Sequence, residues 1–138
     1  MKAQRHVLMI DDDQEIVAGT SLRLRAAGYD VVSASNGEQG IAVAQSLRPD
    51  AIILDVKMPR MSGLTALEFL KGSEVTSKIP VVVLSASLSD QRAALDGGAQ
   101  FYLRKPYKPQ SLLSALDAAI DADVDKSNLQ RPVSGATQ

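Results

Sequence analysis

The 138-residue chain contains no cysteine, which excludes disulfide bonds and metal sites built on thiolates. It has no basic excess, with a formal net charge of -1, so its composition does not favour direct nucleic-acid binding, which usually needs a basic face. It also lacks a long apolar run near its start, where four apolar residues lead straight into three aspartates. Such a run is too short for a signal peptide or a membrane span. We therefore expect a cytoplasmic protein whose partners include neither membrane nor nucleic acid.

Hydrophobic residues make up 45% of the chain, enough to bury the core of one domain. Short apolar runs alternate with helical patterns, and turn residues such as Gly28 and Ser62-Gly63 mark the joins. Strands are expected near residues 5–10, 29–33, 51–55, 80–84 and 100–104, and helices near 13–27, 37–47, 63–71, 89–96 and 109–121. This alternation predicts an α/β fold with a doubly wound parallel sheet covered by helices on both faces.

The helical patterns also predict which faces are buried. In the helix at 13–27, the stripe Ile16, Thr20, Leu24 and Ala27 has the spacing of one core-facing side. Apolar periodicity stops near residue 122, so we expect a folded domain over residues 1–122 and a polar, flexible tail over 123–138.

Polar groups follow four of the predicted strands directly. They are Asp11, Asp12 and Asp13 after the first strand, Asp55 after the third, Ser85 after the fourth and Lys105 after the fifth. The carboxyl ends of parallel strands lie along one edge of the sheet, and ligands bind there. The sequence therefore predicts one cleft that holds several carboxylates, a hydroxyl and an ammonium group.

Carboxylates gathered in a cleft repel each other, so at least one pKa should rise, and a hard divalent cation would relieve the repulsion. Mg²⁺ prefers oxygen ligands, and the absence of nearby His or Cys argues against zinc. The Asp55 carboxylate is also a possible nucleophile towards phosphorus. Lys105 and a metal ion would then neutralise the charge of the transferred group, and Ser85 would donate a hydrogen bond.

Each of these residues also has a simpler interpretation. Asp13 suits the N-cap of the following helix. Lys105 is an ordinary surface lysine unless the strand before it and Pro106 after it fix its position at the sheet edge, where the Lys-Pro bond can be cis. Ser85 is equally acceptable as a turn residue, and Tyr102 as a half-buried packing residue.

Taken together, these segments resemble the receiver domain of bacterial response regulators, the CheY-like family. The matching motifs are Ile10-Asp11-Asp12-Asp13, Leu54-Asp55-Val56-Lys57-Met58-Pro59 with Ser62-Gly63, Leu84-Ser85-Ala86, and Tyr102-Leu103-Arg104-Lys105-Pro106. The resemblance covers about residues 4–121. Four motifs in this order are far more specific than any one of them.

The resemblance implies a flavodoxin-like (βα)5 sheet in the order 2-1-3-4-5. It implies that Asp55 accepts a phosphoryl group from a phosphohistidine on a sensor histidine kinase or a histidine phosphotransfer protein. It further implies Mg²⁺ bound by the Asp12 and Asp55 side chains, by Asp11 through water and by the backbone carbonyl of Lys57. Lys105 would pair with the phosphoryl oxygens, while Ser85 and Tyr102 would switch a surface of the last helices and strand that an unidentified downstream protein reads.

Two departures from the family pattern stand out. Serine occupies position 85, where threonine is commoner, and the separation of 20 residues between Ser85 and Lys105 is slightly short. The shortening should fall in the loop and helix after Ser85. Since no output domain follows within the sequence, we expect a stand-alone receiver.

Two other functions are compatible with such a cleft. One is a Mg²⁺-dependent phosphohydrolase with an aspartyl nucleophile, but such enzymes carry a second aspartate where this chain has Lys57. The other is an adaptor that works without phosphorylation, against which the full acid cluster argues. We therefore predict a switch and not an enzyme, with self-catalysed phosphotransfer and slow self-hydrolysis only.

A docking surface for the phosphodonor is expected beside the cleft. Val17 falls off the predicted core stripe and lies about one helical turn from the acid cluster, which suggests an exposed apolar contact. Pro106 and Tyr107 would complete the patch across the cleft mouth.

Overall fold

The structure is a computed structural model that describes residues 4–129, with side-chain surroundings for residues 4–122. Five strands alternate with five helices in this part of the chain. They are β1 (Arg5–Ile10), α1 (Gln14–Ala26), β2 (Tyr29–Ala34), α2 (Gly37–Leu47), β3 (Ala51–Asp55), α3 (Gly63–Gly72), β4 (Val81–Ser85), α4 (Asp90–Asp96), β5 (Phe101–Arg104) and α5 (Pro109–Leu129). Each expected strand and helix is present, with shifts of a residue or two at most ends.

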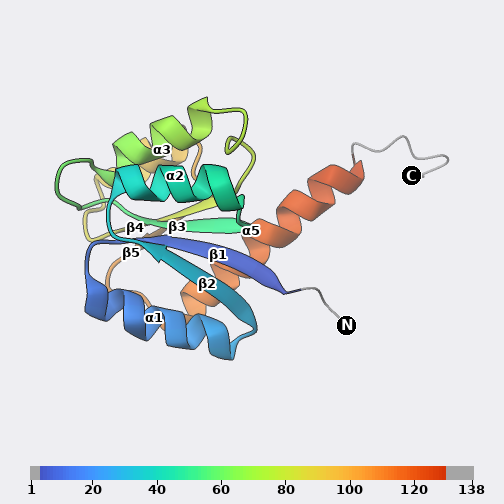
Figure 1. Ribbon diagram of the computed structural model, residues 1–138, viewed down its shortest axis with the longest axis horizontal. Helices are drawn as coiled ribbons and strands as arrows, with labels where there is room; N and C mark the ends of the chain where they lie inside the picture. The colour runs from blue at the N-terminus through green and yellow to red at the C-terminus, as the bar shows by residue number, and fades with distance from the viewer. Residues whose placement is uncertain (1–3, 130–138) are drawn as a thin grey trace.

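The strands form one parallel sheet in the order β2-β1-β3-β4-β5, which confirms the expected topology. Figure 1 shows α1 and α5 on one side of this sheet, with α2 and α3 on the other. Successive residues of the central strand β3 alternate between the two sides: Ile52 and Leu54 pack in the core under α2, α3 and α4, while Ile53 packs in the core under α1 and α5. Burial on both faces explains why the central strands β3 and β4 are almost wholly apolar.

The predicted buried face of α1 is correct at Leu24 but is wrong by one position in the first half of the helix. Its buried residues are Val17, Ser21 and Leu24, whereas Ile16 is 38% exposed. The face is hard to recognise because a serine lies on the buried side, and apolar residues such as Leu22 lie on the exposed side.

The last helix is longer than the sequence suggested. We expected it to end near residue 121, but α5 continues to Leu129, so residues 123–129 of the predicted tail are helical. No glycine or proline interrupts this stretch before Pro132, and polar residues can extend a helix without forming an apolar face. Residues 130–138 of the predicted tail lie outside the described part of the chain.

One glycine allows the backbone to approach the end of β3 closely. A Cβ atom added to Gly63 would lie 2.1 Å from the carbonyl oxygen of Asp55, far inside van der Waals contact. The Gly63 amide also donates to the carbonyl of Val56 at 2.8 Å. Gly63 therefore lets the start of α3 pack directly against the segment that carries Asp55.

We expect Gly63→Ala to destabilise the chain by roughly 1–3 kcal/mol, because backbone must shift to admit the methyl group. Gly19→Ala is the matched control, since a Cβ at Gly19 meets nothing within 4 Å and alanine in a helix is favoured over glycine by roughly 0.5–1 kcal/mol. Urea denaturation measures both changes. Equal stability of the two variants would contradict the close approach.

Candidate functional site

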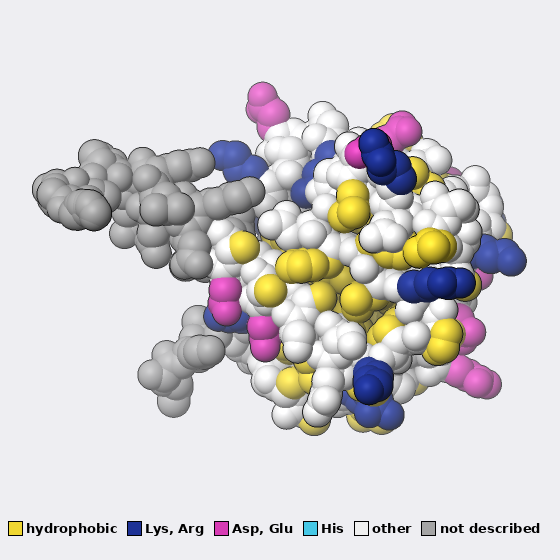
Figure 2. All heavy atoms as spheres, turned by 180° about the vertical axis from the view of Figure 1, so that it is seen from behind, with side chains coloured by type: hydrophobic (Ala, Val, Ile, Leu, Met, Phe, Trp, Pro, Cys, Tyr) yellow, Lys and Arg dark blue, Asp and Glu magenta, His cyan; other side chains and the backbone are white. Residues whose placement is uncertain are grey.

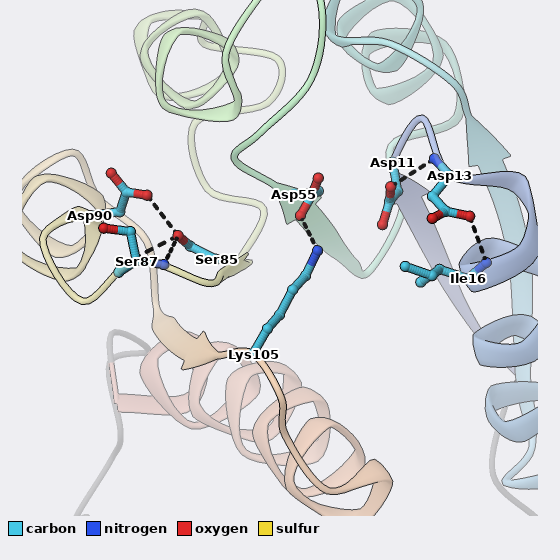
Figure 3. A network of polar contacts seen from close by, with 8 residues as sticks. All are labelled: Asp11, Asp13, Ile16, Asp55, Ser85, Ser87, Asp90 and Lys105. Atoms are coloured by element: carbon cyan, nitrogen blue, oxygen red, sulfur yellow. Dashed lines mark hydrogen bonds and ion pairs between the residues drawn. The ribbon is translucent and has the colours of Figure 1, made fainter.

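The carboxyl ends of β1, β3, β4 and β5 meet at one edge of the sheet. Ile10 is in register with Leu54, Asp55 with Leu84, and Ser85 with Arg104. The residues at or just after these ends therefore converge. They line an open cleft of about 860 Å³ whose walls include Asp11, Asp12, Asp55, Lys57, Ser85 and Lys105, and Figure 3 shows several of these side chains at the strand ends.

Three carboxylates of this cleft form a possible cation site. Asp11, Asp12 and Asp55 each place an oxygen within 4.8 Å of the others. Asp11 and Asp55 are buried, at 2% and 4% exposed, whereas Asp12 is exposed. Among the described residues, the buried side-chain polar atom that lacks a hydrogen-bond partner is Asp11 Oδ2. An unpartnered buried carboxylate oxygen is costly unless a ligand satisfies it, so these residues fit a hard divalent cation such as Mg²⁺.

The predicted rise in carboxyl pKa is found at two positions. Burial raises the pKa of Asp11, and the hydrogen bond from the Asp13 amide at 2.9 Å offsets part of this rise. Burial likewise raises the pKa of Asp55, and the hydrogen bond from Lys105 offsets part of that rise. Both carboxylates are therefore harder to ionise than ordinary ones, which a bound cation would reverse.

Lys105 is part of the site and is not an ordinary surface lysine. Its Nζ donates to Asp55 Oδ1 at 2.6 Å, and the lysine side chain is 27% exposed. Burial alone would lower the pKa of Lys105, but the hydrogen bond and the charge of Asp55 raise it. The peptide bond to Pro106 is cis. The ammonium group is thus charged and lies directly against the candidate phosphoacceptor.

Asp13 caps the following helix, as its simpler interpretation proposed. Its carboxylate accepts hydrogen bonds from the amides of Glu15 and Ile16 at 3.1 and 3.2 Å. This cap fixes the start of α1 immediately beside the acid cluster. The adjacent Asp11 and Asp12 remain available for the cleft.

Ser85 and Tyr102 lie on neighbouring strands, but both engage the loop after β4. The Ser85 hydroxyl is buried and donates to Asp90 Oδ2 at 2.6 Å. The half-buried Tyr102 hydroxyl donates to the backbone carbonyl of Ser87. In Figure 3 the Ser85 side chain points towards Asp90 and away from the Asp55–Lys105 pair.

Part of the predicted docking patch needs correction. Val17 is 7% exposed and packs in the core under α1 and α5, so it is not an exposed docking residue. The neighbouring Ile16 is exposed and lines the cleft. Pro106 is exposed and Tyr107 is half-buried, so these two positions stay compatible with the prediction.

The residues of the cleft that the sequence analysis missed include Ile16, Leu88 and Asp90. Ile16 was placed in the core because the face of α1 was predicted one position out of phase. Asp90 belongs to no recognised motif, and only the fold of the loop shows that it reaches Ser85. The carbonyl of Lys57 and the roles of the individual site residues stay predictions.

The strand order and the acid cluster at the carboxyl edge define a flavodoxin-like α/β protein of the CheY-like class. Residues 7–117 match the family model described as the response regulator receiver domain, and the chain belongs to this family. It is thus the receiver domain of a two-component response regulator, and switching by phosphorylation is the general function of the family.

Individual relatives agree with this assignment. The chain is 39% identical over 116 residues to the DNA-binding dual master transcriptional regulator RpaA of Synechocystis, with 83% of this chain and 48% of that protein covered. It spans about half the length of the curated relatives it matches. The expectation of a stand-alone receiver therefore stays a prediction.

Two solved structures show the similarity of the fold. A putative response regulator from Chloroflexus aurantiacus is 30% identical with a TM-score of 0.82, covering 86% of this chain and 99% of that one. The receiver domain of the sensor histidine kinase PA1611 from Pseudomonas aeruginosa is 28% identical with a TM-score of 0.80, and the same shares are covered. That second structure has a magnesium ion coordinated in its active site cleft. Within residues 4–129 of the present chain, no helix combines the length and apolarity needed to cross a membrane.

The raised pKa of Asp11 makes a prediction about stability without divalent cations. The folded chain binds the proton of the Asp11 carboxyl more tightly than the unfolded chain does. The contribution of this proton to the free energy of unfolding is therefore fully present below the ordinary pKa of 3.8 and is lost as the pH rises through the raised pKa of the folded chain. Asp11→Asn removes this ionisation and keeps an oxygen for the Asp13 amide. We expect it to stabilise the chain at neutral pH, with the gain shrinking towards pH 4.

Chemical denaturation in a chelating buffer at both pH values measures this effect. Asp13→Asn is the control, since asparagine caps a helix about as well as aspartate. Added Mg²⁺ should stabilise the unmodified chain more than the Asp11→Asn variant. A gain that does not change with pH would contradict the assignment to Asp11.

Proposed function

We propose that the chain is a phosphoacceptor switch in which Asp55 receives a phosphoryl group from a phosphohistidine. The observation that carries the proposal is the contact between Lys105 Nζ and Asp55 Oδ1 at 2.6 Å, beside the unpartnered Oδ2 of Asp11. The site thus combines a nucleophilic oxygen, a fixed positive charge and ligands for a cation at one edge of the sheet.

The transfer exchanges one bond to phosphorus for another. Lys105 holds Asp55 Oδ1, so Oδ2 is the oxygen that forms the new P–O bond. The P–N bond to the donor imidazole breaks, and its electron pair returns to the nitrogen, which then takes up a proton. Lys105 moves from the carboxylate to the phosphoryl oxygens and neutralises part of their charge.

The metal in this proposal is Mg²⁺, which Asp12 and Asp55 would hold through their side chains, Asp11 through water and Lys57 through its backbone carbonyl. It supplies charge neutralisation of the phosphoryl oxygens when bound. Lys57 lies on the cleft wall, at the position where a phosphohydrolase of this kind carries its second aspartate. A lysine does not serve there as the acid and base of turnover, which favours the switch over the hydrolase.

Apolar residues around the cleft mouth suit the docking of a donor protein. Ile16 and Leu88 line the cleft and are 38% and 57% exposed, and Met58 also belongs to the cleft wall. Exposed apolar residues that rim a polar site are typical of an interaction surface. We propose that a sensor histidine kinase or a histidine phosphotransfer protein packs here, with Pro106 at the other side of the mouth.

The output surface in this proposal is the face formed by α4, β5 and α5. Figure 2 shows hydrophobic side chains across the middle of the side of the molecule that lies at the back of Figure 1. Leu95 on α4 is 43% exposed, and Tyr102 on β5 is half-buried. A downstream protein would recognise this face after Ser85 and Tyr102 change position.

Phosphorylation of Asp55 is tested with acetyl phosphate and Mg²⁺, followed by intact mass measurement. We expect the mass of a single phosphoryl group on the unmodified chain and none on Asp55→Asn, because no other carboxylate of the cleft contacts Lys105 so closely. The adduct should also require Mg²⁺ and weaken strongly in Lys105→Ala. Phosphate mass on the Asp55→Asn variant would refute the assignment.

Docking at Ile16 is tested with a histidine phosphotransfer protein that phosphorylates the unmodified chain. Ile16→Ser should slow this transfer roughly fivefold or more, the effect of removing a contact at the centre of an interface. Labelling by acetyl phosphate should stay nearly unchanged, since the serine adds no charge to the cleft. Leu22→Ser is the control, because Leu22 is 69% exposed on the same helix but does not line the cleft. Equal slowing by both variants would place the docking surface elsewhere.

A further inference from the structure

The segment from the end of β4 to the start of α4 carries a polar network in which two members, Ser87 and Asp90, have no role in the proposed function. The Ser85 hydroxyl donates to Asp90 Oδ2 at 2.6 Å and accepts from the Ser87 amide at 3.0 Å. A longer contact of 3.4 Å joins the same hydroxyl to the Ser87 carbonyl. Figure 3 shows Ser85 from the end of β4 and Asp90 from α4 facing each other across this loop.

The hydroxyl of Ser85 has a single proton to donate. In this structure the short contact commits that proton to the charged carboxylate of Asp90, and the other contact to the Ser87 carbonyl is too long to compete. The proton is therefore not available to a phosphoryl oxygen on Asp55 until the bond to Asp90 breaks.

We propose that Asp90 is a positioning residue that holds the Ser85 hydroxyl against α4 and thereby opposes the switched conformation. This inference rests on the proposed function, because it assumes that Ser85 turns towards a phosphorylated Asp55. Asp90 opposes the change in two ways: its bond to Ser85 must be lost, and its charge lines the same cleft in which the phosphoryl group appears.

The hydrogen bond between Ser85 and Asp90, which we call the latch, is also connected to Tyr102 through Ser87. The amide of Ser87 donates to Ser85, and the carbonyl of Ser87 accepts from the Tyr102 hydroxyl. When Ser85 turns away, the Ser87 amide loses its acceptor and the loop must rearrange. Ser87 therefore contacts both side chains, so a movement of Ser85 changes the position of the carbonyl that binds the Tyr102 hydroxyl.

The latch makes a quantitative prediction about any ligand that favours the switched conformation. Removing a group that stabilises only the resting conformation increases the affinity for such a ligand. Losing a hydrogen bond to a charged group on a half-exposed residue should raise this affinity roughly five- to twentyfold. A merely structural role for Asp90 predicts the opposite, since a loosened site binds its ligand more weakly.

Beryllium trifluoride with Mg²⁺ serves as the probe, because it mimics a phosphoryl group on a carboxylate without a covalent step. Its affinity is measured by titration calorimetry on the full chain. We expect Asp90→Ala to bind it roughly five- to twentyfold more tightly than the unmodified chain, and Asp90→Asn, which keeps an oxygen acceptor but loses the charge, to fall between the two. Thermal unfolding confirms that each variant is folded.

Two controls isolate the contact. Asp96→Ala removes the same charge from the same helix, where Asp96 is exposed and pairs with Arg92 at 3.3 Å, and it should change the affinity by less than about twofold. In a Ser85→Ala background, most of the gain from Asp90→Ala should disappear, since there is no hydroxyl left to hold and only the effect of the charge remains. The ring signals of Tyr102 should also shift towards those of the bound form in free Asp90→Ala.

The possible results separate the latch from the function on which it rests. Unchanged or weaker binding by Asp90→Ala, an equal gain in Asp96→Ala, or an undiminished gain from Asp90→Ala without the Ser85 hydroxyl would each overturn the latch. If the unmodified chain does not bind the probe, or if Asp55→Asn binds it equally well, the proposed function fails, and the latch fails with it.

Discussion

The buried contact between the Asp55 carboxylate and the Lys105 ammonium is the interaction on which the rest of the site depends. It joins the ends of β3 and β5 across β4, so it fixes the segment after β5 at the edge of the sheet. Burying either charge alone would be strongly unfavourable, whereas the pair satisfies both. The same lysine balances only part of the negative charge, because Asp11 and Asp12 lie within 4.8 Å of Asp55 at their nearest oxygens. The negative charge that remains is of the kind that a bound cation would neutralise.

Most of this site was predictable because its signals are local. A polar residue that ends an apolar strand identifies the end of the strand and the edge of the sheet at which ligands bind. The parallel register then places Asp11, Asp55, Ser85 and Lys105 along this one edge. The order of the strands came from the resemblance of the four motifs to a known family, and the structure confirms it.

The features that the sequence did not predict depend on contacts between distant segments. The buried side of α1 includes Ser21, whereas Ile16 points to the cleft, so a rule based on apolar spacing chose the wrong face. The end of α5 was placed too early because polar residues stop an apolar pattern without stopping a helix. The contact of Asp90 with Ser85 depends on the path of the loop between them, and no spacing rule describes that path.

The short segment after Ser85 has a physical consequence for the switch. Only residues 86–89 separate β4 from α4, so the first turn of the helix begins within reach of the Ser85 hydroxyl, and Asp90 occupies that turn. The two side chains that would contact the oxygens of a phosphoryl group on Asp55 are then already paired inside the chain, Lys105 with Asp55 and Ser85 with Asp90. Phosphorylation would exchange these contacts for others of the same kind and would not add contacts to an empty site. Since gains and losses largely cancel in such an exchange, the switched conformation lies only a few kcal/mol above the resting one in the free chain, and a single charged group is enough to change which of them is populated.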